Sequence, residues 1–215
     1  QGNVAISIAF SDLTGNTGDA VTATTNSSSV LYDRAVPTLS AVTVTSNNDN
    51  SAYAKEGDIV TLSFTSSENL QTDPTVTMDG NAATVSGSNT SWTAAYTMQS
   101  GDTEGDVNFT IDFLDLASNS GSRVTSLTSG DKIVYDETVP TLPTVDISSN
   151  NTNGATFAKV GDVISISVSA SENIQTPTVT IAGNAAAIAS GSNGERVYTA
   201  TYMMQSSDNT GVIPF

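Results

Sequence analysis

The sequence predicts an all-β chain in which similar sandwich-like units follow one another. Three observations predict it: short motifs recur about every 103 residues, apolar and polar residues alternate in short stretches, and no segment shows a helical period. Strict alternation places the apolar side chains on one face of a strand, where a second sheet can cover them. We therefore expect repeated two-sheet domains, each large enough to bury a core of its own.

The repeat is seen in motifs that return at nearly constant spacing. Pro37-Thr38-Leu39 returns as Pro140-Thr141-Leu142, 103 residues later. Lys55-x-Gly57-Asp58 returns as Lys159-x-Gly161-Asp162, 104 residues later. This spacing predicts three pieces: the C-terminal part (last strands) of a first unit in residues 1–36, a complete unit in residues 37–139, and the N-terminal part of a third unit in residues 140–215.

Within the complete unit, each expected strand carries alternating inward residues. Asp79-Gly80-Asn81 tolerates positive φ and predicts a hairpin turn, and the irregular stretch 124–135 predicts a break near Gly130. About seven strands per unit match an immunoglobulin-like Greek-key β-sandwich, with Trp92 as a core anchor in the absence of a disulfide. The expected inward residues are Val42 and Val44; Val60, Leu62 and Phe64; Val76 and Met78; Trp92, Ala94, Tyr96 and Met98; and Val107, Phe109, Ile111 and Phe113.

The composition disfavours several classes of function. The 215 residues include 6 basic and 22 acidic side chains, and the net charge of −16 disfavours binding to nucleic acid and to anionic membranes. Cysteine and histidine are absent, so disulfides, thiolate metal sites and the commonest catalytic bases are missing, and we expect no enzyme. The acidic surface, rich in Thr and Asn and poor in Lys, favours an extracellular location at a bacterial cell surface.

Five motifs, taken in order, resemble a known family. They are Ala54-Lys55-Glu56-Gly57-Asp58, Thr65-Ser66-Ser67-Glu68-Asn69, Gly80-Asn81-Ala82-Ala83, Asp115-Leu116-Ala117-Ser118-Asn119 and Tyr135-Asp136-Glu137-Thr138-Val139-Pro140. Together they resemble the tandem bacterial immunoglobulin-like repeats of large secreted surface proteins and adhesins. The resemblance implies a module of an extracellular stalk, adhesin or filament, and related tandem adhesins are frequently rigidified by Ca²⁺. It names no ligand.

Acidic residues are expected to gather at the poles of each unit, where linker and loops meet. One pole of the complete unit combines Asp33, Glu68, Asp115 and Asn119, and Asp12 occupies the position of Asp115 in the first unit. The opposite pole supplies Glu56, Asp102 and Glu104, and the joint that follows adds Asp136 and Glu172. Because Ca²⁺ takes six to eight oxygen ligands in flexible geometry, these sets predict calcium at interdomain joints. The preference of turns for Asp and Asn explains the same residues without an ion.

Two arrangements of units and two functions stay open. Val4, Ile6, Ile8 and Phe10 correspond to the sixth strand, and 212–215 to the start of that same strand, so a neighbouring copy could complete the third unit by strand complementation. The adjacent repeat of one longer chain could do the same, and both explanations expect units arranged head to tail. The alternative function is an adhesin domain that binds a glycan or protein ligand through its loops. Inward aromatic residues disfavour sugar stacking.

Overall fold

The computed structural model describes residues 1–215, and the chain is all-β without a helix. It divides into two compact units, Gln1–Glu137 and Thr138–Phe215, each with its own sheets and core. The sequence analysis placed this boundary after residue 139 and treated residues 1–36 as a separate piece; the structure includes them in the first compact unit. No helix of the structure has the length and apolarity needed to cross a membrane.

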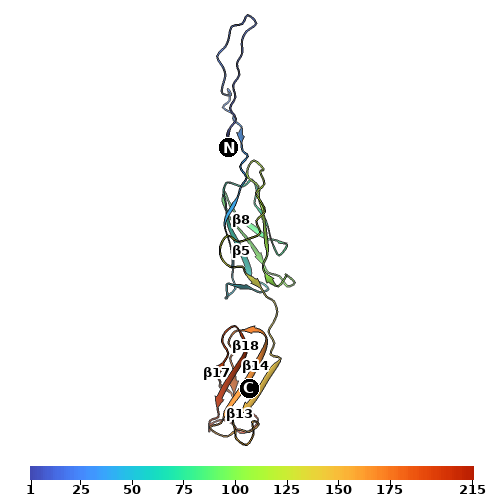
Figure 1. Ribbon diagram of the computed structural model, residues 1–215, viewed down its shortest axis with the longest axis vertical. Helices are drawn as coiled ribbons and strands as arrows, with labels where there is room; N and C mark the ends of the chain where they lie inside the picture. Colours follow the sequence, from blue (N-terminus) through green and yellow to red (C-terminus); the bar gives the residue numbers. More distant parts are fainter. The chain divides into compact units, whose positions relative to one another are not determined.

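A four-stranded antiparallel sheet forms one layer of the 1–137 unit. Its strands, in spatial order, are β3 (Leu39–Ser46), β5 (Ile59–Ser66), β9 (Ser91–Thr97) and β8 (Thr84–Ser88), of which β5 and β8 are labelled in Figure 1. In β5, Val60, Leu62 and Phe64 are at most 3% exposed, and the residues between them are partly exposed. The alternation in the sequence is therefore the burial pattern of this strand.

Two three-stranded sheets cover the other side of the core. The first contains β11 (Phe109–Asp112), β6 (Thr75–Met78) and β7 (Asn81–Ala82). The second contains β10 (Gly105–Asp106), β12 (Val134–Tyr135) and β4 (Tyr53–Ala54), with β12 and β4 parallel. Between β11 and β12 the chain makes only isolated bridges, and Gly130 has a φ of 84°, which agrees with the irregular last stretch that the sequence predicts. The unit has a β-sandwich-like architecture.

One hydrophobic core joins these layers. It contains Leu62 and Trp92 from the first layer and Met78, Ile111 and Tyr135 from the second. Trp92, expected as a core anchor, is 6% exposed, although its Nε1 has no hydrogen-bond partner. The Tyr135 hydroxyl lies 2.8 Å from the Gln99 carbonyl oxygen and 2.8 Å from Glu137 Oε2, so a buried phenol satisfies its donor at the edge of the core.

Residues 1–36 form a hairpin whose pairing matches that of the β10–β12 region. Strands β1 (Gly2–Asn3) and β2 (Leu31–Tyr32) pair Gly2 with Tyr32, as β10 and β12 pair Gly105 with Tyr135. A bridge between Ile8 and Val21 likewise matches the bridge between Ile111 and Val124. The apolar residues expected in a sixth strand, Val4, Ile6, Ile8 and Phe10, are 39–56% exposed, and past β1 only isolated bridges form. A narrow hairpin alone has no second sheet against which to bury them.

The 138–215 unit contains a second four-stranded antiparallel sheet. Its spatial order is β13 (Thr144–Ser149), β14 (Val163–Ile174), β18 (Glu195–Met203) and β17 (Ala187–Ser190), all labelled in Figure 1. A separate hairpin pairs β15 (Thr180–Ile181) with β16 (Asn184–Ala185). Ile164, Ile166 and Val168 are at most 7% exposed, as the alternation predicts.

Both units contain the same tight turn. Asp79 and Gly80 join β6 to β7 with φ of 45° and 83°, and Ala182 and Gly183 join β15 to β16 with φ of 55° and 77°. Positive φ at both central residues is the geometry of a two-residue hairpin turn whose twist matches that of the strands. The sequence predicts the first turn; the second places alanine in a conformation that side chains with a Cβ disfavour.

Candidate metal site

The site is built on a five-residue loop that follows β11, from Asp115 to Asn119. Asp115 is fully buried, and its Oδ1 accepts hydrogen bonds from the backbone N–H groups of Ala117 and Asn119, both at 2.8 Å. Asn119 Nδ2 donates to Asp115 Oδ2 at 2.7 Å. An aspartate that accepts from the backbone two and four residues later holds the loop closed, so the sequence places this carboxylate locally.

Two further carboxylates reach this loop from distant parts of the sequence. Asp33 directly follows β2, near the end of the hairpin of residues 1–36; its Oδ1 accepts from Ala35 N at 2.9 Å, and its Oδ2 accepts from the Gln1 side-chain amide. Glu68 follows β5, in a loop held by the Ser66 hydroxyl, which donates to the Glu68 carbonyl oxygen at 2.7 Å. These short-range contacts set the backbone from which each carboxylate extends.

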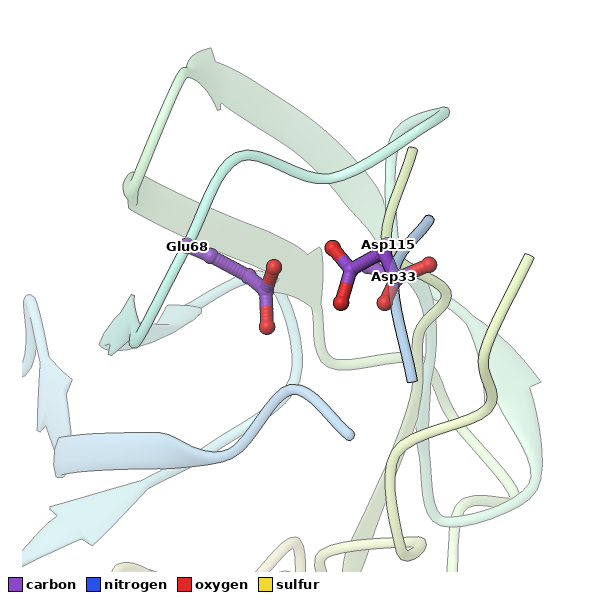
Figure 2. Close-up of side chains that lie close together, drawn as sticks. All are labelled: Asp33, Glu68 and Asp115. Carbon is purple, nitrogen blue, oxygen red and sulfur yellow. The ribbon is translucent and has the colours of Figure 1, made fainter. Parts of the chain in front are cut away.

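The three carboxylates form one cluster. One oxygen from each of Asp33, Glu68 and Asp115 lies within 4.8 Å of the other two, and no other trio of acidic side chains in the structure does so. Figure 2 shows the Glu68 side chain extending toward Asp115 and Asp33. Asn119 completes the surroundings, because its Nδ2 also lies 3.4 Å from the Asp33 carbonyl oxygen. The sequence analysis grouped these four residues at one pole, and the structure brings them together.

The environment separates the pKa values of the cluster. Partial burial, together with the negative charges of Asp33 and Asp115, raises the pKa of Glu68 above its ordinary value of 4.5. Burial would also raise the pKa of Asp115, but hydrogen bonds from Asn119, Ala117 and Ser118 outweigh it and lower that pKa. Asp115 is therefore the firmly ionised member, and Glu68 is the member that carries the cost of like-charge crowding.

The donor set fits a hard cation. Two oxygens bound to one Ca²⁺ at about 2.3–2.6 Å lie at most roughly 5 Å apart, a limit that the 4.8 Å cluster respects. The donors are carboxylates, with a carbonyl oxygen of Asp33 nearby and no histidine or cysteine anywhere in the chain, so the chemistry suits Ca²⁺ or Mg²⁺ better than zinc. Asp33, Glu68 and Asp115 are the residues that would hold such an ion.

Asp12, predicted as a ligand in the first unit, closes a loop of its own. Its Oδ1 accepts from the backbone of Thr14 and Asn16 at 2.9 and 2.8 Å, and its Oδ2 accepts from Asn16 Nδ2 at 2.7 Å. Hydrogen bonds from the side chains of Asn16 and Thr14 lower its pKa strongly. The loop repeats the geometry of Asp115–Asn119, but no other carboxylates join Asp12 in a cluster.

The residues predicted for the opposite pole do not form a carboxylate trio. Asp102 serves its own loop, accepting from Gln99 N at 2.7 Å, from Asn81 Nδ2 at 2.9 Å and from the Tyr96 hydroxyl at 3.1 Å. Glu104 Oε1 accepts from Glu137 N at 3.2 Å, and Glu56 is exposed. Asp102 stabilises a turn, which is the explanation without an ion that the sequence analysis also weighed.

The last predicted pair, Asp136 and Glu172, belongs to different units. Asp136 donates its backbone N–H to the Ala54 carbonyl oxygen at 2.9 Å. Glu172 lies in β14, and its Oε1 is buried without a hydrogen-bond partner. Sequence reasoning missed Gln1, whose amide contacts Asp33; the residue 103 positions later is Glu104, so no motif marks this amide.

No protein-family model matches the chain, and no curated protein matches it.

Proposed function

We propose that this chain is a structural repeat module of an extracellular bacterial stalk, adhesin or filament, extended head to tail and stiffened by calcium at its joints. The observation that carries the proposal is the cluster of Asp33, Glu68 and Asp115. Asp33 precedes the first strand of the sandwich, whereas Glu68 and Asp115 come from two of its loops. An ion held by all three would tie the incoming chain to the domain and remove freedom from the joint.

The strand order supports immunoglobulin-like units. Named in chain order as A, B, D and E, the strands β3, β5, β8 and β9 lie in the spatial order A-B-E-D, which is the order of one sheet of that fold. The four-stranded sheet of the 138–215 unit has the same order. Matching loops at Asp12 and Asp115, 103 residues apart, support a tandem repeat and hence the resemblance to bacterial immunoglobulin-like adhesin repeats.

The charge of the chain agrees with a solvated extracellular module. Burial first, and then repulsion from the carboxylates of Asp33 and Asp115, raise the pKa of Glu68. A bound divalent cation would cancel the repulsion between these carboxylates. We infer a non-enzymatic role, because the buried carboxylate of Asp115 is occupied with hydrogen bonds from its own loop.

The test compares thermal unfolding of the full chain in EDTA and in excess CaCl₂. If calcium binds only the folded cluster, a concentration of 100 Kd stabilises the 1–137 unit by about 2.7 kcal/mol. Glu68→Gln is expected to lose most of this shift, and Glu56→Gln, the same substitution at an exposed glutamate, is expected to keep it. An unfolding temperature that is equal in EDTA and calcium would overturn the calcium part of the proposal.

The alternative is ligand binding through the loops. The single tryptophan is buried at 6% exposure, so it offers no platform for a sugar. Tyr53, which is 45% exposed in β4, is one of the exposed aromatic side chains that favour ligand binding. Loss of adhesion in Tyr53→Ser, with unchanged calcium response, would favour ligand recognition over a purely structural role.

A further inference from the structure

The 138–215 unit reproduces one part of the 1–137 unit. In the four-stranded sheets, Ile147 pairs with Ile166 as Val44 pairs with Leu62. In the small hairpins, Ile181 pairs with Asn184 as Met78 pairs with Asn81. In the 1–137 unit, however, β6 also pairs with β11, whereas in the 138–215 unit β15 pairs with β16 alone. The second edge of β15 therefore has no strand beside it.

The 138–215 unit has a hollow at the place where the 1–137 unit has a buried tyrosine. The hollow measures about 900 Å³ and is lined by Phe157, Ile164, Met204 and Gln205, among others. By sequence these residues match Tyr53, Val60, Met98 and Gln99. In the 1–137 unit, Tyr135 is fully buried in the same core as Val60 and Met98. Its hydroxyl lies 2.8 Å from the Gln99 carbonyl oxygen. A tyrosine in the matching place would enter the hollow and occupy part of it.

The hairpin of residues 1–36 carries this tyrosine and the missing strand. It has the pairing of β10 with β12, offset by 103 residues, yet its apolar side chains are exposed. Tyr32 is 61% exposed against 0% for Tyr135, Ile8 is 56% against 0% for Ile111, and Phe10 is 53% against 5% for Phe113. The chain thus has an exposed apolar hairpin in residues 1–36. It also has an open face in residues 138–215 that matches the face on which β11 and β12 are buried in the 1–137 unit.

We propose that the hairpin of residues 1–36 of one copy docks on the open face of residues 138–215 of a second copy. The register follows from β11 on β6: Ile6 lies opposite Ile181, Ser7 opposite Thr180 and Ile8 opposite Val179. Tyr32 enters the hollow, and β2 runs parallel to residues 157–158 as β12 runs parallel to β4. The contact is head to tail, so it can propagate from copy to copy. It rests on the matched pairings and not on the calcium site.

Residues 211–215 overlap with part of the docked hairpin. Ala182 N donates to the Pro214 carbonyl oxygen at 2.9 Å, as Asp79 N donates to the Asn108 carbonyl oxygen at 2.8 Å, so Pro214 occupies the place of Asn108. Ala5 of the hairpin matches that same place. The incoming strand therefore exchanges with residues 211–215 and continues along β15 beyond them.

Cysteine pairs test the register directly. Thr77 and Thr110 face each other across β6 and β11 with their hydroxyl oxygens 2.8 Å apart, so Ser7→Cys and Thr180→Cys place two thiols at the matching positions. The chain has no other cysteine. Each variant is made alone, one of them with ¹⁵N label, and the two are mixed and oxidised in EDTA. The expected product is a dimer with one labelled and one unlabelled chain.

The control mixes Ser7→Cys with Val197→Cys, because Val197 in β18 is 57% exposed. The matched pair is expected to give about tenfold more mixed dimer than this control. Adding Tyr32→Ser to the Ser7→Cys chain is expected to lower the yield about tenfold, because the buried aromatic anchor is lost. Circular dichroism checks that each variant keeps its β content.

Two results would overturn the proposal: a mixed-dimer yield no higher than that of the Val197→Cys control, or a yield that Tyr32→Ser leaves unchanged. Because the assay runs in EDTA, docking can succeed where the calcium proposal fails. A calcium response without cross-linking would support the calcium proposal and overturn the docking proposal. The acidic copies, each with a net charge of −16, are expected to associate more strongly as salt screens their repulsion.

Discussion

Asn119 donates a hydrogen bond from Nδ2 to Asp115 Oδ2 at 2.7 Å and thereby closes the loop that holds the fully buried carboxylate. The same bond recurs between Asn16 and Asp12 at 2.7 Å, in the exposed hairpin of residues 1–36. Asp115 therefore has two roles that can be separated by experiment: it holds its own loop, and it contributes one oxygen to the acidic cluster. Asp12 has only the first role within its unit.

Asp115→Asn is expected to lower the unfolding temperature of the 1–137 unit by several degrees, even in EDTA. The substitution replaces a charged acceptor of three hydrogen bonds with a neutral amide, in a buried site where unmet donors are costly. Asp12→Asn is the matched control, because it alters the same loop on an exposed hairpin. Equal effects of the two substitutions in thermal unfolding would contradict this account.

Glu68→Gln is expected to stabilise the calcium-free chain at pH 7. The pKa of Glu68 is raised from 4.5, so folding disfavours its ionised form, and the neutral amide removes that cost. As the pH falls through the raised pKa, wild-type Glu68 takes up a proton, and the advantage of the variant shrinks until it is lost below 4.5. Denaturant unfolding of both proteins between pH 7 and pH 4 measures the difference. A gain that grows on acidification would have the wrong sign.

Calcium binding should also weaken as the pH falls, since a proton at Glu68 competes with the ion. The loss is expected to begin at a pH above 4.5, because the pKa of Glu68 is raised and that of Asp115 is lowered. Calorimetric titration at a series of pH values follows it. Affinity that is independent of pH down to 4 would place the ion away from Glu68.

Gly121→Ala is expected to destabilise the 1–137 unit by about 1–3 kcal/mol. An added Cβ at Gly121 would overlap the ring of Phe113, which is 5% exposed and held by the core. Gly18→Ala makes the same overlap with Phe10, but that ring is 53% exposed and can move. Thermal unfolding of the two variants should therefore differ, and comparable losses would show that the two rings are equally constrained.

Ala182→Asn is expected to stabilise the 138–215 unit by about 1 kcal/mol. Ala182 has a φ of 55° in the tight turn between β15 and β16, a conformation that asparagine tolerates far better than alanine. Hydrogen exchange of peptides that cover residues 176–188 locates the effect. Unchanged or faster exchange there would indicate that the alanine conformation carries no strain.

Some apolar residues of alternating stretches are buried, and others are exposed. The alternation of Val60, Leu62 and Phe64 predicted their burial correctly, because a strand has a period of two whatever its neighbours are. The same reasoning assigned Val4, Ile6, Ile8 and Phe10 to a strand, yet these residues are exposed and only bridged. Alternation states which face is apolar; it does not supply the sheet that covers that face.

Local sequence patterns set each acidic loop, whereas tertiary packing set which carboxylates meet. The sequence alone determined the all-β class, the strong negative charge and the Asp-x-x-x-Asn loops, since each depends on composition or on residues at most four apart. Only the tertiary structure decided that Asp33, Glu68 and Asp115 meet, while Glu56, Asp102 and Glu104 form no such trio. The reason is that a carboxylate extends from its loop by a few ångströms, so convergence depends on how separate loops pack, which no short-range pattern encodes.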